Sequence, residues 1–248
     1  MSTSSTSTYN LSAQDIIDLA LTDIGVAGQS GGAAPDAGLR THALKLLNLL
    51  LKRLDSEGAL LWHIQRTTQT LTSGTAAYAL SNTISDIDEP ARYTASGSTY
   101  GSQVWSMARD EYMTLPDRTI QGVPYRYYAE KSLDATGIQA ITLYLYPVPP
   151  TTGDTLEFAA VLRMKDVTSL NQTLDIPQNW SNVVRQGLAV ELAPSYGVPA
   201  TTIAMMRKVY EDEKRLVLMN DNERGGLQLV PWGNSVMYGY GQHAGGSR

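Results

Sequence analysis

Apolar residues recur at helical spacing near the start of the chain. Ser12 and Asp15 stand in the S-x-x-D arrangement of a capping box, and the residues after them predict a helix that ends at Gly25. Pro35 and Asp36 predict the start of a second helix, whose apolar face is wide enough to contact two neighbours. That face consists of Leu39, Ala43, Leu46, Leu47, Leu50, Leu51 and Leu54.

Between residues 62 and 175 the period changes from helical to alternating. In residues 139–146, three aliphatic side chains face one side while a threonine and two tyrosines face the other, which is typical of a half-buried strand. Residues 155–161 predict a second strand, and weaker strand patterns cover residues 64–71, 104–109 and 125–131. Several short strands at this spacing favour a small β-sandwich or barrel.

Helical spacing returns after Asp175. Pro177 fits the first turn of a third helix, and Pro199 predicts the start of a fourth. The residues expected to face inward are Trp180, Val183, Val184, Leu188 and Leu192 in the third helix, and Ile203, Met206, Tyr210 and Val217 in the fourth. Because neither pair of helices can bury its apolar stripe alone, we expect the two pairs to pack together.

This order of elements predicts an α+β fold. Residues 1–10 form a flexible, Ser/Thr-rich arm. Residues 11–61 and 176–222 build a four-helix bundle, and residues 62–175 form an inserted antiparallel β-sandwich or barrel-like domain that projects from one end of it. Residues 223–248, rich in glycine, form an extended C-terminal arm.

Composition excludes several classes of protein. The chain carries 19 Lys and Arg against 24 Asp and Glu, so it has no basic excess that could clamp a phosphate backbone. It contains no Cys, which excludes disulfides and thiolate metal sites and fits a reducing compartment. No apolar run approaches the ~20 residues of a membrane span, so we expect no membrane partner.

Neither metal nor catalytic motifs stand out. The three histidines, His42, His63 and His243, are not at ligand spacing, and the common phosphate-loop, hydrolase-elbow and zinc-protease motifs do not occur. We therefore expect no metal, no cofactor and no enzymatic activity.

Two clusters of acidic residues could still take part in catalysis. Asp86, Asp88 and Glu89 precede Pro90 and are interpreted as turn residues, and residues 211–213 are interpreted as a solvated helix face. Because paired carboxylates can cleave glycosidic bonds, a cell-wall hydrolase that uses Asp86 or Glu89 with Glu211 is kept as the least favoured alternative.

Tyrosine is unusually frequent. The chain has 14 Tyr against one Phe. Tyrosine suits interfaces and also half-buried sheet surfaces, because it combines apolar area with a hydroxyl. Both interpretations stay open.

Several motifs resemble those of one protein family. These motifs occur in order over about residues 11–222. They are residues 12–25, residues 43–54, the run Gly122-Val-Pro followed by Leu143-Tyr-Leu-Tyr-Pro-Val-Pro, and the run Ile176-Pro-Gln-Asn-Trp. Their order and spacing resemble the head–tail adaptor proteins of tailed phages, including the tail tubular A proteins of short-tailed phages and the adaptors that stabilise packaged DNA.

The resemblance implies a structural role in the virion, after assembly in the host cytoplasm. Family members form a ring, usually of twelve identical subunits, below the portal protein. The helices form the wall of the ring, and the β insertion faces a downstream tail component such as a nozzle or tube. The ring extends the DNA channel, helps to retain the packaged double-stranded genome and needs neither cofactor nor catalysis. The main alternative is a tail-fibre or receptor-binding module whose β part recognises glycan.

Three expectations follow for partners. The C-terminal arm should attach to the portal through alternating apolar residues, namely Leu227, Leu229, Val230, Trp232, Tyr238 and Tyr240. Acidic or neutral residues should line the channel, so that DNA passes without specific binding; residues 62–175, with eight basic and twelve acidic side chains, fit this. The free protein should be monomeric or weakly associated, because no apolar stripe beyond the needs of the bundle is evident.

Overall fold

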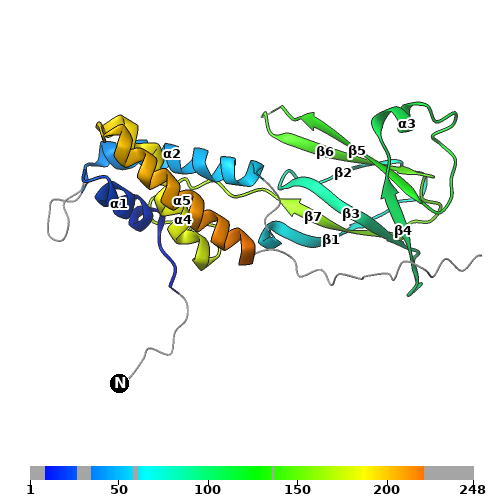
Figure 1. Ribbon diagram of the computed structural model, residues 1–248. Helices are drawn as coiled ribbons and strands as arrows, with labels where there is room; N and C mark the ends of the chain where they lie inside the picture. The colour runs from blue at the N-terminus through cyan, green and yellow to red at the C-terminus, as the bar shows by residue number, and fades with distance from the viewer. Residues whose placement is uncertain (1–8, 27–34, 58–60, 136, 221–248) are drawn as a thin grey trace, which may run out of the picture.

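The computed structural model describes residues 9–26, 35–57, 61–135 and 137–220. These residues form a helical part and a β part that lie end to end (Figure 1). The chain passes between the two parts at η1 (Leu61–His63) and again along residues 163–177. The helical part contains α1 (Ala13–Asp23), α2 (Ala37–Ser56), η2 (Gln178–Trp180), α4 (Ser181–Leu192), η3 (Ala193–Tyr196) and α5 (Ala200–Asn220).

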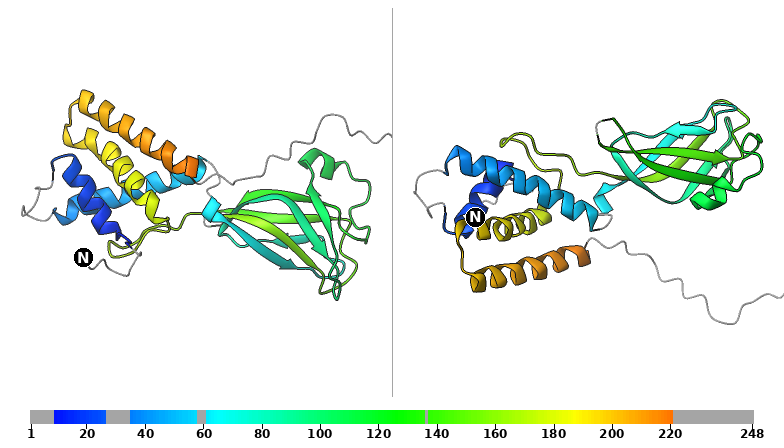
Figure 2. Two further views of the ribbon diagram at one scale, coloured as in Figure 1. Left: turned by 60° about the horizontal axis from the view of Figure 1, so that its bottom comes forward. Right: turned by 90° about the horizontal axis from the view of Figure 1, so that it is seen from above.

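Helix α4 is the centre of the helical part. It packs against α1, α2 and α5, and Figure 2 shows α5 on one side of it with α1 and α2 on the other. Trp180 of η2 and Leu188 of α4, both predicted to face inward, are buried, as are Tyr210 and Val217 of α5. The predicted bundle geometry is not confirmed, because the main packing contacts of α5 are with α4 and its flanking 3-10 turns.

The predicted capping box begins α1. The Asp15 N–H donates to the Ser12 hydroxyl oxygen at 3.2 Å, and the Ser12 N–H donates to the Asp15 carboxylate at 2.9 Å. The helix stops before Gly25, whose φ of 77° is a left-handed conformation that glycine adopts without strain. Both ends of α1 therefore follow from local sequence.

Replacing Ser12 by Ala should lower the free energy of unfolding by about 1 kcal/mol at neutral pH. Hydrogen bonds from Ser12 hold the pKa of Asp15 below its usual range. The stability that this carboxylate contributes is thus present above its unfolded pKa of about 3.9 and is lost as pH falls through the folded pKa. Urea unfolding at pH 7 and pH 3 should show a smaller difference between wild type and Ser12→Ala at pH 3. An equal difference at both would contradict this account.

Gly187 of α4 lies where side chains of both α2 and α5 pack against the α4 backbone. A Cβ atom there would lie 2.9 Å from Cε2 of Tyr210 in α5 and 3.1 Å from a methyl of Leu50 in α2. Gly187→Ala should therefore destabilise the protein by about 1–3 kcal/mol through overpacking, although Ala is the better helix former. Thermal unfolding measures the effect. An increase in stability, as helix propensity alone would produce, would show that the helices have room to separate.

The β part is one curled sheet of seven strands in the order β1-β7-β3-β4-β5-β6-β2 (Figures 1 and 2). Neighbouring strands are antiparallel except β4 and β5, which are parallel over two residue pairs. The strands are β1 (Ile64–Thr70), β2 (Ala77–Ala79), β3 (Ile84–Thr94), β4 (Gly101–Ser106), β5 (Arg126–Leu133), β6 (Gln139–Tyr146) and β7 (Thr155–Leu162). The inside of the curl is apolar and holds Val104, Leu143, Leu156 and Phe158.

The mixed α+β class is thus confirmed, and the β6 prediction is correct in both its bounds and its buried face, Ile141, Leu143 and Leu145. The separate sheets of a sandwich are not confirmed, because all seven strands join one sheet. The interpretation of Asp86, Asp88 and Glu89 as turn residues is wrong, because they lie in β3. A register shift between Asp88 and Arg92 accommodates Pro90, which sequence patterns treat as a strand breaker.

Candidate interaction surfaces

The acidic residues that could have formed a hydrolytic pair lie on different parts of the molecule. Asp86 of β3 forms an ion pair with Lys131 of β5 at 2.8 Å, and Glu89 accepts a hydrogen bond from Ser106. Glu211 lies on α5, whose packing partners are α4, η2 and η3. The structure therefore does not assemble the pair that the hydrolase alternative requires.

The histidines also lie on different elements of the structure. His63 is buried at the crossover into β1, where its Nδ1 lies 2.9 Å from the Leu162 carbonyl oxygen. His42 is exposed on α2, and His243 lies outside the described residues. In the part of the chain that the structure describes, no group of three or more His, Asp or Glu side chains is arranged to hold a metal ion.

The residues predicted to contact the portal are outside the described part of the chain. These residues are Leu227, Leu229, Val230, Trp232, Tyr238 and Tyr240. The described part ends at Asn220, the last residue of α5. The prediction for the arm therefore stays a prediction.

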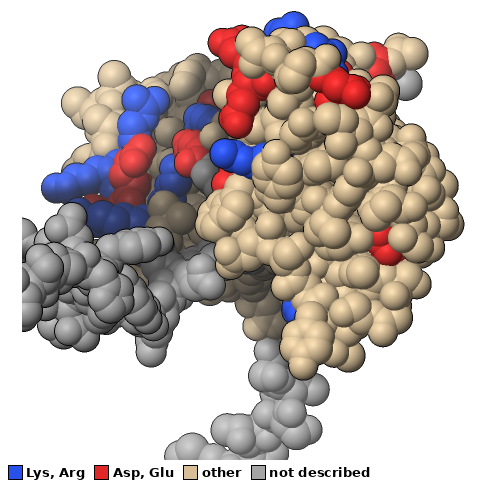
Figure 3. Space-filling model, turned by 90° about the vertical axis from the view of Figure 1, so that its right-hand side faces the viewer, with Lys and Arg blue, Asp and Glu red and all other residues tan. Residues whose placement is uncertain are grey.

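The end of the β part that points away from the helices is built from four uncharged segments. Residues 71–76, 95–103, 119–125 and 146–153 contain no Asp, Glu, Lys or Arg. We call this surface the uncharged end. Figure 3 looks onto it and shows a broad face with few charged side chains, with most charges gathered along its upper edge.

Hydrogen bonds join residues 71–76 and residues 119–125 to residues 146–153. The Ser73 hydroxyl donates to the Pro150 carbonyl oxygen at 2.7 Å, and the Gly122 N–H donates to the Val148 carbonyl oxygen at 2.9 Å. Segments that are up to about 80 residues apart in sequence are therefore fixed relative to one another, and sequence periodicity contains no signal for this.

A fully buried carboxylate stabilises the uncharged end from the interior of the β part. Asp154, at the start of β7, accepts the Tyr93 hydroxyl at 2.5 Å and the Ser96 N–H at 2.9 Å. Burial, together with this hydrogen bond, raises the pKa of Tyr93 far above its ordinary value. The carboxylate thus connects β3, the β3–β4 turn and β7.

The uncharged end exposes apolar and aromatic side chains among neutral polar groups. Tyr100, Ile120, Val123 and Tyr125 are exposed large side chains on these segments. Burying such a surface requires no desolvation of charge, and a contact made through it should depend little on salt. These properties suit a protein–protein contact.

The tyrosines divide between buried and exposed positions. Among the residues that the structure describes, six are buried, namely Tyr78, Tyr93, Tyr112, Tyr127, Tyr128 and Tyr210. On the outer face of β5 and β6, Tyr112 of α3 (Arg109–Met113) stacks on Tyr128 with ring centroids 5.2 Å apart, and Tyr144 lies 5.3 Å from Tyr112. Most of the buried tyrosines therefore stabilise the β part, while Tyr100 and Tyr125 are available to a partner.

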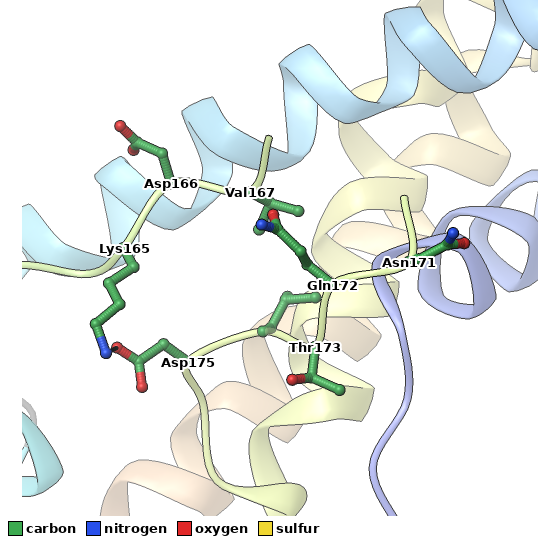
Figure 4. A pocket seen from close by; sticks show the side chains of 8 residues that line it. Lys165, Asp166, Val167, Asn171, Gln172, Thr173 and Asp175 are labelled. Carbon is green, nitrogen blue, oxygen red and sulfur yellow. Dashed lines mark ion pairs between the residues drawn. The ribbon is translucent and has the colours of Figure 1, made fainter. Parts of the chain in front are cut away.

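A cavity of about 470 Å³ lies in the crossover between β7 and α4 (Figure 4). Its polar side chains bind one another: Lys165 and Asp175 form an ion pair at 3.4 Å, and Gln172 accepts the Thr168 N–H at 2.9 Å. The same crossover is held on α2 by Asn48, whose side chain bonds to both the N–H and the carbonyl of residue 167. We interpret this crossover as the connection that fixes the helical part and the β part relative to each other.

The outer face of α5 contradicts one premise of the sequence analysis. Met205, Val209, Leu216 and Met219 are exposed along one line of this helix. We call this line the α5 stripe. The expectation that no apolar stripe is left exposed was wrong, because α5 has apolar residues on two sides and only one of them is buried.

Comparison with known proteins decides the family. A family model described as SU10 adaptor protein matches residues 11–227. The chain belongs to the SU10 adaptor protein family. The match supports the phage head–tail adaptor that the resemblance predicted, and it favours this function over the tail-fibre and hydrolase alternatives. No curated protein gives a match.

The adaptor family is structural, which agrees with the separation of the acidic residues described above. The family match ends at Leu227, so Trp232 and the two tyrosines of the predicted arm lie beyond it. Within the described ranges, no helix of the adaptor combines the length and apolar character that a membrane span requires.

Proposed function

We propose that this adaptor forms a ring of twelve subunits at the head–tail junction of a phage virion. The ring docks below the portal protein, extends the DNA channel, helps to retain the packaged genome and presents a platform for a downstream tail component. Membership of the adaptor family supports this function, and the separation of the molecule into two parts supplies two opposite ends for two partners.

We assign the uncharged end as the platform for the downstream tail component. It lies at the end of the β part remote from the helices, because β1 and β7 meet the crossovers at Ile64 and Leu162 and reach this end at Thr70 and Thr155. A surface without charge has no strong affinity for DNA, and its exposed apolar groups fit the face of another protein.

The platform can be tested by adding a charge to it. Val123→Asp should weaken co-sedimentation with the tail component at least about tenfold, because the carboxylate would be buried without a partner. Binding to the portal should not change. Thr68→Glu adds the same charge at an exposed position of β1, outside the uncharged end, and should leave both interactions intact. An equal loss of binding to the tail component in both variants would contradict the platform. The ring itself is tested by negative-stain images of adaptor mixed with portal.

DNA is expected to pass through the ring without a specific contact. The isolated adaptor should show only weak affinity for duplex DNA, because each phosphate contact would retard the moving genome. Fluorescence anisotropy with labelled duplex at two salt concentrations measures this. A tight affinity that falls steeply with salt would contradict a passive channel.

A further inference from the structure

The α5 stripe is an exposed apolar line, although Met205 and Val209 also line a shallow pocket with Ala189 of α4. The four side chains of the stripe are between 54% and 70% exposed, whereas Tyr210 and Val217 on another side of α5 are buried. The spacing of 205, 209, 216 and 219 keeps one face of a helix over four turns, and Asp212 occupies its middle position. Such a face is the kind of surface that packs against another helix.

The stripe is poorly suited to bind a second copy of itself. Aligning the whole stripe with its counterpart, parallel or antiparallel, places the two Asp212 carboxylates opposite each other at the centre. Like charges at that position oppose the contact. A different surface, of complementary charge, is therefore the better partner for the stripe.

The outer face of α1 offers a surface of complementary shape and charge. A groove of about 450 Å³ is lined by the exposed side chains of Tyr9 and Leu19 and by the carboxylates of Asp15 and Asp18. Residues 9–26 contain three Asp and no Lys or Arg. Since Arg40 of α2 forms an ion pair with Asp18, Asp15 is the carboxylate of the groove that no cation balances.

The stripe has basic residues beside it. Lys208 and Arg215 are exposed and lie three or four residues from Met205, Asp212 and Met219, which places them along the edge of the stripe. Arg215 reaches Asp212 at 3.7 Å and so partly neutralises the middle of the line. An apolar line with a basic edge matches an apolar groove with an acidic wall.

We propose that the α5 stripe of one copy packs into the α1 groove of the next copy. Helix α5 lies on one side of α4 and α1 on the other, so that the two surfaces of one molecule face different neighbours (Figure 2). A contact between two different surfaces is heterologous, and it closes into a ring or continues as a chain. The inference rests on the proposed function only for the closure of that ring.

Single cysteines test the contact directly, because the natural chain has no Cys to compete. Val209→Cys places a thiol on the stripe and Leu19→Cys places one in the groove, both at exposed positions whose substitution should not disturb folding, as circular dichroism can verify. Mild oxidation of the mixed variants should give a disulfide-linked dimer at several times the yield of either variant alone. The yield should fall as salt rises from about 50 mM to about 500 mM, because the charges at the edge are solvent-exposed.

Leu49→Cys is the matched control, an exposed leucine on the outer face of α2 that the proposed contact does not use. If Val209→Cys links to Leu49→Cys as readily as to Leu19→Cys, or prefers to link to itself, the inference is overturned. Failure to link in any combination overturns it as well. Negative-stain images of the same variants on portal keep the two proposals apart: rings without the 209–19 link would refute this contact alone, and the link without rings would refute the proposed ring.

Discussion

Truncation of the adaptor after Arg224 is expected to abolish its co-sedimentation with the portal protein. The removed segment contains seven glycines, which make ordering costly, and several large apolar residues, which must supply the binding energy. Leu227 and Leu229 alternate with Gln228, as in a segment that places every second side chain in a pocket. The loss should exceed that of any single substitution in the helical part.

Trp232 is the expected anchor of this contact. Buried tryptophans dominate interface hot spots, so Trp232→Ala should weaken portal binding by roughly 2 kcal/mol or more, which is about 30-fold. Gln228→Ala removes a polar side chain from the same segment and should bind like wild type. If the truncated chain binds the portal with wild-type affinity, attachment comes from the helical part instead.

Asp154→Ala is expected to lower the free energy of unfolding by about 3 kcal/mol or more. The substitution leaves the buried Tyr93 hydroxyl without its acceptor, which costs about 1–3 kcal/mol, and removes the acceptor of the Ser96 N–H, which contributes about 1 kcal/mol more. Asp154→Asn retains one acceptor oxygen and should cost less. Asp166→Ala, at an exposed ion pair with Lys52, should change stability by less than about 1 kcal/mol. Urea unfolding of the four proteins measures this order.

The pH dependence of the same site provides a second readout. The pKa of Tyr93 is raised in the folded protein by burial and by Asp154, so its contribution to stability is present below the unfolded pKa of about 10. That contribution is lost as pH rises through the higher folded pKa. Wild type should therefore lose more stability than Asp154→Ala at strongly alkaline pH. Similar losses in both would show that Asp154 is not what raises the pKa of Tyr93.

The sequence by itself determined the elements whose signals are local. The capping box at Ser12, the stop at Gly25 and the alternation of residues 139–146 each involve neighbours within a few residues, and each was predicted correctly. The order of helices and strands was enough for the α+β class and for the adaptor family, because periodicity and motif order do not depend on how distant segments meet.

Only the tertiary structure decided which distant segments come together. Strand β3 was missed because Pro90 and three acidic residues hide a strand that its neighbours β7 and β4 stabilise through their hydrogen bonds. The uncharged end exists because the curl of the sheet gathers four separate segments at one end. Helix α5 has apolar residues on two sides, and the packing of α4 against Tyr210 and Val217 decided which side is buried and which is left for a partner.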